Sequence, residues 1–182
     1  MKAWKRVGDA ELLHNGWRKI FRKTFVMANG KQMQAEIFDK DGSEAAAVIA
    51  LTPDMRVIIA RQFRCGPERI FDELPGGIVN AGESPKEAAL RELEEETGYE
   101  AGRVEYLGKV YKHAWMAMSF NYYIAYDCIP SGRGSSQDKF EDIEVDEISI
   151  SQLIDNARNT KMSDTEAVFL AYETLKKLEE EA

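Results

Sequence analysis

The chain has 182 residues, and its 24 lysines and arginines against 32 aspartates and glutamates give a net charge of −8. A chain of this length forms one ordinary domain, with room for a small appendage, and needs no disulfide framework or structural zinc to stabilise its core. The negative charge and the lack of a Lys/Arg-rich tract argue against general DNA or RNA binding, which relies on cationic neutralisation of phosphates.

The sequence also lacks the signals of a membrane or secreted protein. Its longest apolar run, Ala45 to Leu51, is far shorter than the ~20 residues that a membrane-spanning helix requires. The basic N-terminus leads into no apolar segment of the signal-peptide type. We therefore expect a cytoplasmic protein, in which Cys65 and Cys128 are buried, unpaired thiols.

The N-terminal half is predicted to contain antiparallel strands. Two β-rich stretches between Trp17 and Phe38 flank Asn29-Gly30, a dipeptide that suits the positive φ angles of a tight turn. A second hairpin is predicted from Ala45–Leu51 to Met55–Gln62, across Thr52-Pro53-Asp54. Further strands are expected at Val104–Lys112, Ser119–Asp127 and Glu144–Ile150.

Helices are better marked than strands. The first is predicted to begin at Ser84, with a proline at its first position and Glu87 at its third, and to end at Gly98. Another is predicted to begin with the capping box Ser163-Asp164-Thr165-Glu166, and a shorter one to cover Ser151–Arg158. Strands and helices mixed in this order indicate an α+β or α/β sandwich.

Three glutamates on the first helix indicate a chemical function. Glu92, Glu95 and Glu96 stand at positions i, i+3 and i+4, so their carboxylates share one helix face. Like charges at this spacing cost roughly 0.2–0.5 kcal/mol per pair, which favours a compensating cation. Oxygen ligands of this kind suit Mg²⁺ or Mn²⁺. The alternative is a solvated acidic helix face.

The residues around the glutamates form a longer pattern. Gly77, five residues, Glu83, seven residues and then Arg91-Glu92-Leu93-x-Glu95-Glu96-x-Gly98-Tyr99 match the fixed positions of the Nudix box. On these residues the chain resembles the Nudix hydrolases, which use divalent metal and water to hydrolyse nucleoside diphosphates linked to another group.

Segments outside the box resemble one branch of that family. Arg61-Gln62-Phe63-Arg64, Glu73-Leu74-Pro75-Gly76-Gly77 and Lys161-Met162-Ser163-Asp164 are similar to segments of the ADP-ribose pyrophosphatases. This resemblance implies an α/β/α sandwich with a mixed sheet between helices, formed by residues 43–182. It also implies that residues 1–42 form a β-strand unit that makes a homodimer, commonly by exchange of strands between subunits.

The resemblance assigns roles within the box. It implies that Glu92, Glu95 and Glu96 ligate the metal and carry catalysis, with the backbone carbonyl of Gly76 as a further ligand. It also implies that Arg91 orients these catalytic glutamates.

The partner of Arg91 is left open by the sequence. The resemblance pairs it with Glu83, whereas helical spacing alone allows an ordinary surface pair between Glu87 and Arg91.

A general base is implied beyond the box. In the ADP-ribose branch a loop glutamate is implicated, and Glu141 is the candidate here. Glu144 and Asp142 are alternatives, and the whole acidic stretch could also be a solvated charge run.

Four further residues are candidates for substrate binding. Arg61 and Arg64 could hold a phosphate or stack on a base, Glu73 could approach the metal or a ribose, and Trp115 could line a base or sugar pocket. Each could equally be an ordinary surface or packing residue. The segment 112–118 lacks the proline that many ADP-ribose hydrolases carry there, which weakens the assignment to ADP-ribose.

The function expected from this resemblance is hydrolysis of a nucleoside diphosphate sugar, with ADP-ribose giving AMP and ribose 5-phosphate. Alternatives are pyrophosphatase activity on GDP-mannose or NADH, and a non-catalytic ligand sensor built on the same fold. The intact box argues against the sensor.

Overall fold

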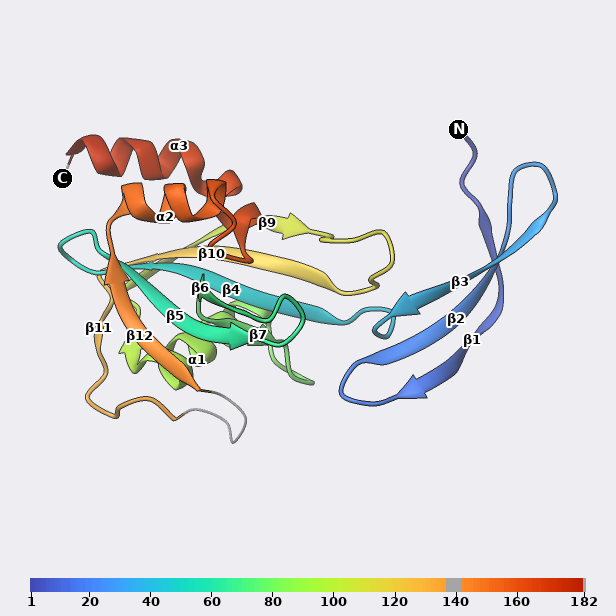
Figure 1. The fold of residues 1–182 in the computed structure, drawn as a ribbon, viewed down its shortest axis with the longest axis horizontal. Helices are drawn as coiled ribbons and strands as arrows, with labels where there is room; N and C mark the ends of the chain where they lie inside the picture. Colours follow the sequence, from blue (N-terminus) through green and yellow to red (C-terminus); the bar gives the residue numbers. More distant parts are fainter. Residues whose placement is uncertain (137–141, 182) are drawn as a thin grey trace. The chain divides into compact units, whose positions relative to one another are not determined.

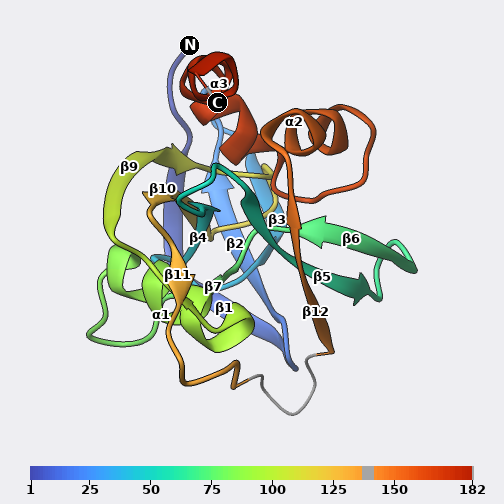
Figure 2. The same ribbon diagram turned by 90° about the vertical axis from the view of Figure 1, so that its left-hand side faces the viewer.

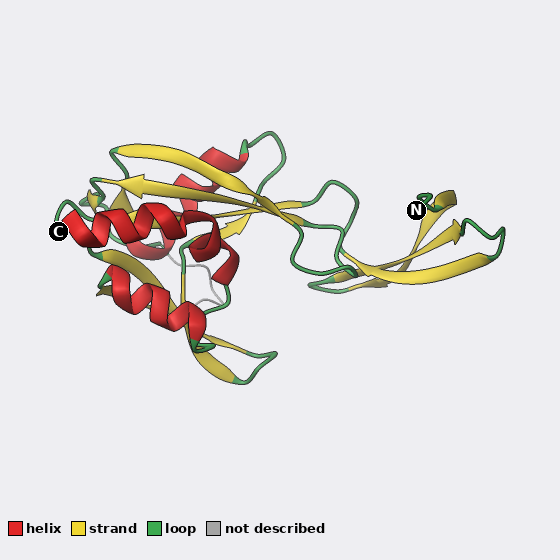
Figure 3. Ribbon diagram, turned by 90° about the horizontal axis from the view of Figure 1, so that it is seen from above, coloured by secondary structure: helices red, strands yellow, loops and turns green. Residues whose placement is uncertain are grey.

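The computed structural model describes residues 1–136 and 142–181. The chain forms two compact units. The first unit comprises Met1–Glu44 and Tyr111–Phe120, and the second comprises Ala45–Val110 and Asn121–Ala182. Among the described residues the helices all belong to the second unit, and the first is built of strands and loops (Figure 3).

The first unit is a three-stranded antiparallel sheet in the order β1-β2-β3, formed by Lys5–Asn15, Lys19–Val26 and Gln32–Phe38. The predicted hairpin is confirmed: Gly30 has a φ of 83°, and its N–H donates to the Met27 carbonyl at 2.9 Å. Strand β1 was not predicted. It is exposed along most of its length, and register shifts interrupt its pairing, so no alternation of apolar and polar residues marks it.

The second unit contains a seven-stranded sheet in the order β12-β5-β4-β10-β9, with β6 paired to β5 and β7 to β4. Its longer strands are β4 (Glu44–Leu51), β5 (Val57–Arg64), β9 (Arg103–Val110), β10 (Ser119–Tyr126) and β12 (Ile143–Ile148). The shorter strands are β6 (Arg69–Glu73) and β7 (Gly76–Ile78), and β8 (Tyr99–Glu100) pairs separately with β11 (Ile129–Pro130). The predicted strands are therefore confirmed within one or two residues, whereas β6, β7, β8 and β11 were not predicted.

Helices cover both faces of this sheet. Helix α1 (Pro85–Thr97) lies on one side, and α2 (Ile150–Arg158) and α3 (Thr165–Glu181) lie on the other (Figures 1 and 2). Strand β4 is buried from Ala45 to Leu51, as expected of a strand covered on both faces. Ala88, Ala89 and Leu93 of α1 pack with one face of the sheet. The predicted α/β/α sandwich is confirmed.

Helix α1 begins and ends as predicted. The Ser84 hydroxyl accepts from the Glu87 N–H at 3.3 Å, and the Glu87 carboxylate accepts from the Ser84 N–H at 2.8 Å. At the other end Gly98 takes a φ of 75°, and its N–H donates to the Glu94 carbonyl at 2.8 Å. Both ends of the helix that carries the glutamates are thus fixed by local sequence.

Two smaller predictions were wrong. Helix α3 begins at Thr165, and the hydroxyl of Ser163 donates to the carboxylate of Glu73 instead of forming the expected capping box. Cys128 is buried as expected, but Cys65 is exposed near the tip of the β5–β6 hairpin, and both thiols are unpaired. Within the described part of the chain, no helix is long and apolar enough to cross a membrane.

Candidate active site

Helix α1 presents the three predicted glutamates beside one arginine. Nη1 of Arg91 donates to Oε1 of Glu92 and to Oε2 of Glu95, each at 2.8 Å. The opposite edge of the guanidinium contacts Glu83, with 2.8 Å from Nε to Oε1 and 3.2 Å from Nη2 to Oε2. Arg91 thus bridges the loop before α1 to two of the glutamates on the helix.

These contacts decide between the two predicted partners of Arg91. Glu83 is its partner, while the Glu87 carboxylate forms part of the capping box. The hydrogen bonds from Arg91, followed by one from the backbone of Asn80, lower the pKa of Glu83 below its usual value. Glu83 raises the pKa of Arg91 in turn, so the ion pair is fully charged near neutral pH.

The third glutamate, Glu96, is almost fully buried and faces the strand before α1. Its Oε2 accepts the backbone N–H of Gly76 at 3.0 Å. A side chain on Gly76 would place its Cβ 2.5 Å from the Cβ of Ala47, and one on Gly77 would place its Cβ 2.1 Å from Oε1 of Glu92. The two glycines therefore let strand β7 lie against β4 and against the acidic face of α1.

The donor set fits a hard divalent cation. The side chains at this face supply carboxylate oxygens, which Mg²⁺ and Mn²⁺ prefer. Among residues 1–136 and 142–181, however, no three acidic, histidine or cysteine side chains converge as a ready-made metal site. Arg91 binds one oxygen each of Glu92 and Glu95, and Glu96 accepts from Gly76, so ligation by all three requires their carboxylates to turn toward the ion.

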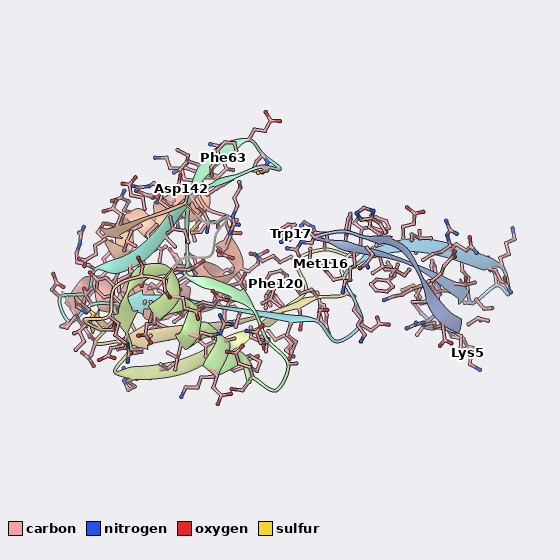
Figure 4. The ribbon with its side chains drawn as sticks, turned by 90° about the horizontal axis from the view of Figure 1, so that it is seen from below. Lys5, Trp17, Phe63, Met116, Phe120 and Asp142 are labelled. Atoms are coloured by element: carbon pink, nitrogen blue, oxygen red, sulfur yellow. The ribbon has the colours of Figure 1, made fainter. Side chains whose placement is uncertain are left out.

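A second ion pair lies at the β5–β6 hairpin. Nε and Nη2 of Arg64 donate to the same oxygen of Glu73, at 2.8 and 2.5 Å, and the Glu73 side chain is only 3% exposed. Burial opposes the charge on Arg64, but the pair with Glu73 outweighs it and the pKa of Arg64 is raised. Phe63, the neighbour of Arg64, marks this hairpin in Figure 4.

The structure does not bring Arg61 to the same place as Arg64. Successive side chains of a strand point to opposite faces, so residues three apart on β5 diverge. Arg61 forms ion pairs with three carboxylates of neighbouring strands, at 2.6 Å to Asp72, 2.9 Å to Asp146 and 3.2 Å to Glu144. Arg61 therefore fastens β5 to β6 and β12, and Arg64 is the better candidate for an anion contact.

Two of the three candidates for the general base, Asp142 and Glu144, lie in the described part of the chain. Glu141 lies outside the described residues. Asp142 is exposed directly before β12 (Figure 4), and Glu144 is exposed on β12, where its carboxylate pairs with Arg61.

Trp115 belongs to the first unit. Its side chain is exposed and lines an apolar cavity of about 370 Å³ with residues that include Trp4 and Phe25. The same tryptophan lines a second cavity of about 300 Å³ with Arg18 and Phe38.

One polar contact near Glu73 was not predicted from the sequence. Oγ of Ser163, which was expected to cap a helix, lies 2.7 Å from Oε1 of Glu73. The two residues are 90 positions apart, and no local pattern links them.

Comparison with known proteins identifies the class. The NUDIX domain model matches residues 43–171. An ADP-ribose pyrophosphatase of Bacillus subtilis is 31% identical over 151 residues, 82% of this chain and 80% of the relative. A methanol dehydrogenase activator of Bacillus methanolicus is 29% identical over 143 residues, 78% of this chain and 76% of the relative.

A solved structure described as an ADP compounds hydrolase shares the fold, with a TM-score of 0.82 and 22% identity over 98% of this chain and 97% of the other. The chain belongs to the Nudix family. It is a Nudix hydrolase, a class whose members generally use divalent metal ions.

Proposed function

We propose that this Nudix hydrolase cleaves the diphosphate linkage of ADP-ribose, giving AMP and ribose 5-phosphate. The observation that carries the proposal is the array on α1, in which Arg91 joins Glu83 to Glu92 and Glu95 while Glu96 lies against the entering strand. The similarity over most of the chain to an ADP-ribose pyrophosphatase supports the choice of substrate.

In this reaction a protein of negative net charge must bind and activate a negatively charged substrate. The oxygen of a water molecule forms a bond to one phosphorus, the anhydride P–O bond breaks, and the water's proton is released. When bound, Mg²⁺ or Mn²⁺ supplies positive charge that neutralises the diphosphate oxygens and lowers the pKa of the water. Glu92, Glu95 and Glu96 would hold the ion, with the Gly76 carbonyl as a further ligand. Arg91 would orient the carboxylates of Glu92 and Glu95.

Arg64 is the proposed contact for the diphosphate. Its guanidinium is held at one edge by Glu73, while its side chain remains 45% exposed. A fixed, partly exposed guanidinium matches the planar fork with which arginine binds phosphate oxygens. Trp115 is proposed to bind the base or sugar, because its exposed ring lines an apolar cavity.

Glu141 is proposed as the general base. The carboxylate of the alternative, Glu144, forms an ion pair with Arg61, which favours Glu141 over Glu144. Replacement of Glu141 by Gln is expected to lower kcat by about 10²- to 10⁴-fold, the usual contribution of a positioned base. The same replacement at Glu144 is expected to leave kcat within a few-fold, and the reverse order would transfer the role to Glu144.

A homodimer is the proposed assembly. Strand β1 is a long, exposed edge strand, and Trp4, Leu12 and Trp17 are exposed on the first unit. Association between two chains can pair the open edge of a sheet and bury exposed apolar side chains away from water. A cytoplasmic location is also proposed, and the two unpaired thiols support a reducing compartment.

The experiment that tests the function is a substrate panel in the presence of Mg²⁺. It contains ADP-ribose, GDP-mannose, ADP-glucose, UDP-glucose, NADH, diadenosine polyphosphates and nucleoside triphosphates, with products separated by chromatography. Selective conversion of ADP-ribose supports the proposal. Preference for another compound would overturn the assignment of ADP-ribose as the substrate. The absence of turnover on every compound would overturn the proposed catalytic function.

A further inference from the structure

The buried carboxylate of Glu73 is shared between two partners from distant parts of the chain. Its Oε2 receives both hydrogen bonds from Arg64, and its Oε1 receives the hydroxyl of Ser163 at 2.7 Å. Because each oxygen has its own donor, the two contacts together fix the plane of the carboxylate.

The hydroxyl proton of Ser163 is committed to Glu73. Oδ2 of Asp164 is the other carboxylate oxygen near Oγ, but at 3.5 Å it is much farther away, and a hydroxyl has only one proton to donate. Asp164 accepts instead from the hydroxyl of Tyr122 at 3.2 Å. Burial, followed by the charges of Asp164 and Glu166, raises the pKa of Tyr122, so this phenol keeps the proton that it donates.

The orientation of Arg64 depends on the orientation of Glu73. Nε and Nη2 of Arg64 both contact Glu73, and Nη1 has no hydrogen-bond partner among residues 1–136 and 142–181. Turning the Glu73 carboxylate would therefore turn the guanidinium.

The segment that carries Ser163 is held in place without its hydroxyl. The backbone N–H of Asp72 donates to the Lys161 carbonyl at 2.9 Å, and the backbone N–H of Lys161 donates to the Asn156 carbonyl at 3.1 Å. Ser163 is itself exposed. Removing its hydroxyl should therefore leave the loop before α3 attached to β6.

We propose that Ser163 is a positioning residue for substrate binding: its hydroxyl fixes the carboxylate of Glu73, which aims the guanidinium of Arg64 at the diphosphate. This inference rests on the proposed function, and in particular on the contact between Arg64 and a phosphate oxygen. It extends the site beyond the box, to the loop before α3.

Steady-state kinetics on ADP-ribose with Mg²⁺ tests the proposal. Ser163→Ala is expected to raise KM by about 3- to 10-fold, the effect of losing one ordinary hydrogen bond, because the hydroxyl acts on the substrate only through Glu73 and Arg64; kcat is expected to stay within about twofold. Ser163→Thr keeps a hydroxyl at an exposed position and is expected to restore KM. Ser149→Ala removes a serine that caps α2 and is the matched control, with an unchanged KM.

A double-mutant cycle with Arg64→Lys separates positioning from a general structural effect. If Ser163 acts through Arg64, Ser163→Ala changes KM by less than about twofold in the Arg64→Lys background. An equal effect in both backgrounds, or failure of Ser163→Thr to restore KM, would overturn the inference while leaving the proposed function intact. A wild-type protein that does not turn over ADP-ribose would overturn the proposed function itself.

Discussion

Arg91 joins three carboxylates at the proposed catalytic face of α1. Its guanidinium contacts Glu83 on one edge and both Glu92 and Glu95 through Nη1. Lysine cannot reproduce this planar fork, although it keeps the charge. We therefore propose that the geometry of the donors of Arg91, beyond its charge, holds the carboxylates of Glu92 and Glu95 in place.

Replacement of Arg91 by lysine tests that account. We expect activity or the apparent affinity for Mg²⁺ to fall by about 10- to 100-fold, as is usual when a residue that orients metal ligands is changed. The matched control is Arg133→Lys, because Arg133 pairs with Glu94 on the same helix and is more exposed. Kinetics at varied Mg²⁺ measure both effects, and equal behaviour of the two variants would contradict the account.

The pH dependence of stability follows from Glu83. Its pKa is lowered in the folded protein, so its pair with Arg91 stabilises the fold above the ordinary glutamate range. This stabilisation is lost as the pH falls through the lowered value. We expect thermal unfolding to show wild type more stable than Glu83→Gln at pH 7, with the difference shrinking toward pH 3. A difference that grows toward acid pH would refute this assignment.

Among the elements, helix α1 has a start that is defined by a local capping box. Ser84→Ala removes the hydroxyl that accepts from the Glu87 N–H and is expected to cost about 1 kcal/mol of unfolding free energy. Ser84→Asp supplies another N-cap acceptor and should recover most of the loss. Denaturant unfolding measures both variants. Equal stability of wild type and Ser84→Ala would show that packing alone defines the start of α1.

The sequence predicted the features that depend on contacts between residues close together in the chain, and it did not predict the contacts between distant residues. Helix α1 and its glutamates were predicted because caps and the i, i+3, i+4 spacing are local. The contact between Ser163 and Glu73 was missed because it joins residues far apart in the chain. The separation of Arg61 from Arg64 was foreseeable, since residues three apart on the predicted strand must face opposite ways.

For the whole molecule, the open edge strand β1 and the exposed apolar side chains of the first unit predict that two chains associate. Light scattering should give a mass near twice 20.6 kDa. Trp17→Glu introduces a charge at a side chain that is 87% exposed and should favour the monomer, whereas Phe169→Glu changes a similarly exposed aromatic residue on α3 and should not. A monomeric wild-type protein would contradict the proposed dimer.

The assignment of the metal-binding glutamates is tested by turnover of ADP-ribose with and without Mg²⁺, by wild type and by the variant Glu95→Gln/Glu96→Gln. We expect wild type to form AMP and ribose 5-phosphate only in the presence of the metal. We expect the double variant to remain folded, because both replacements keep the shape of the side chains, but not to turn over the substrate. Full activity of the double variant would contradict the assignment of these glutamates as the metal-binding and catalytic residues.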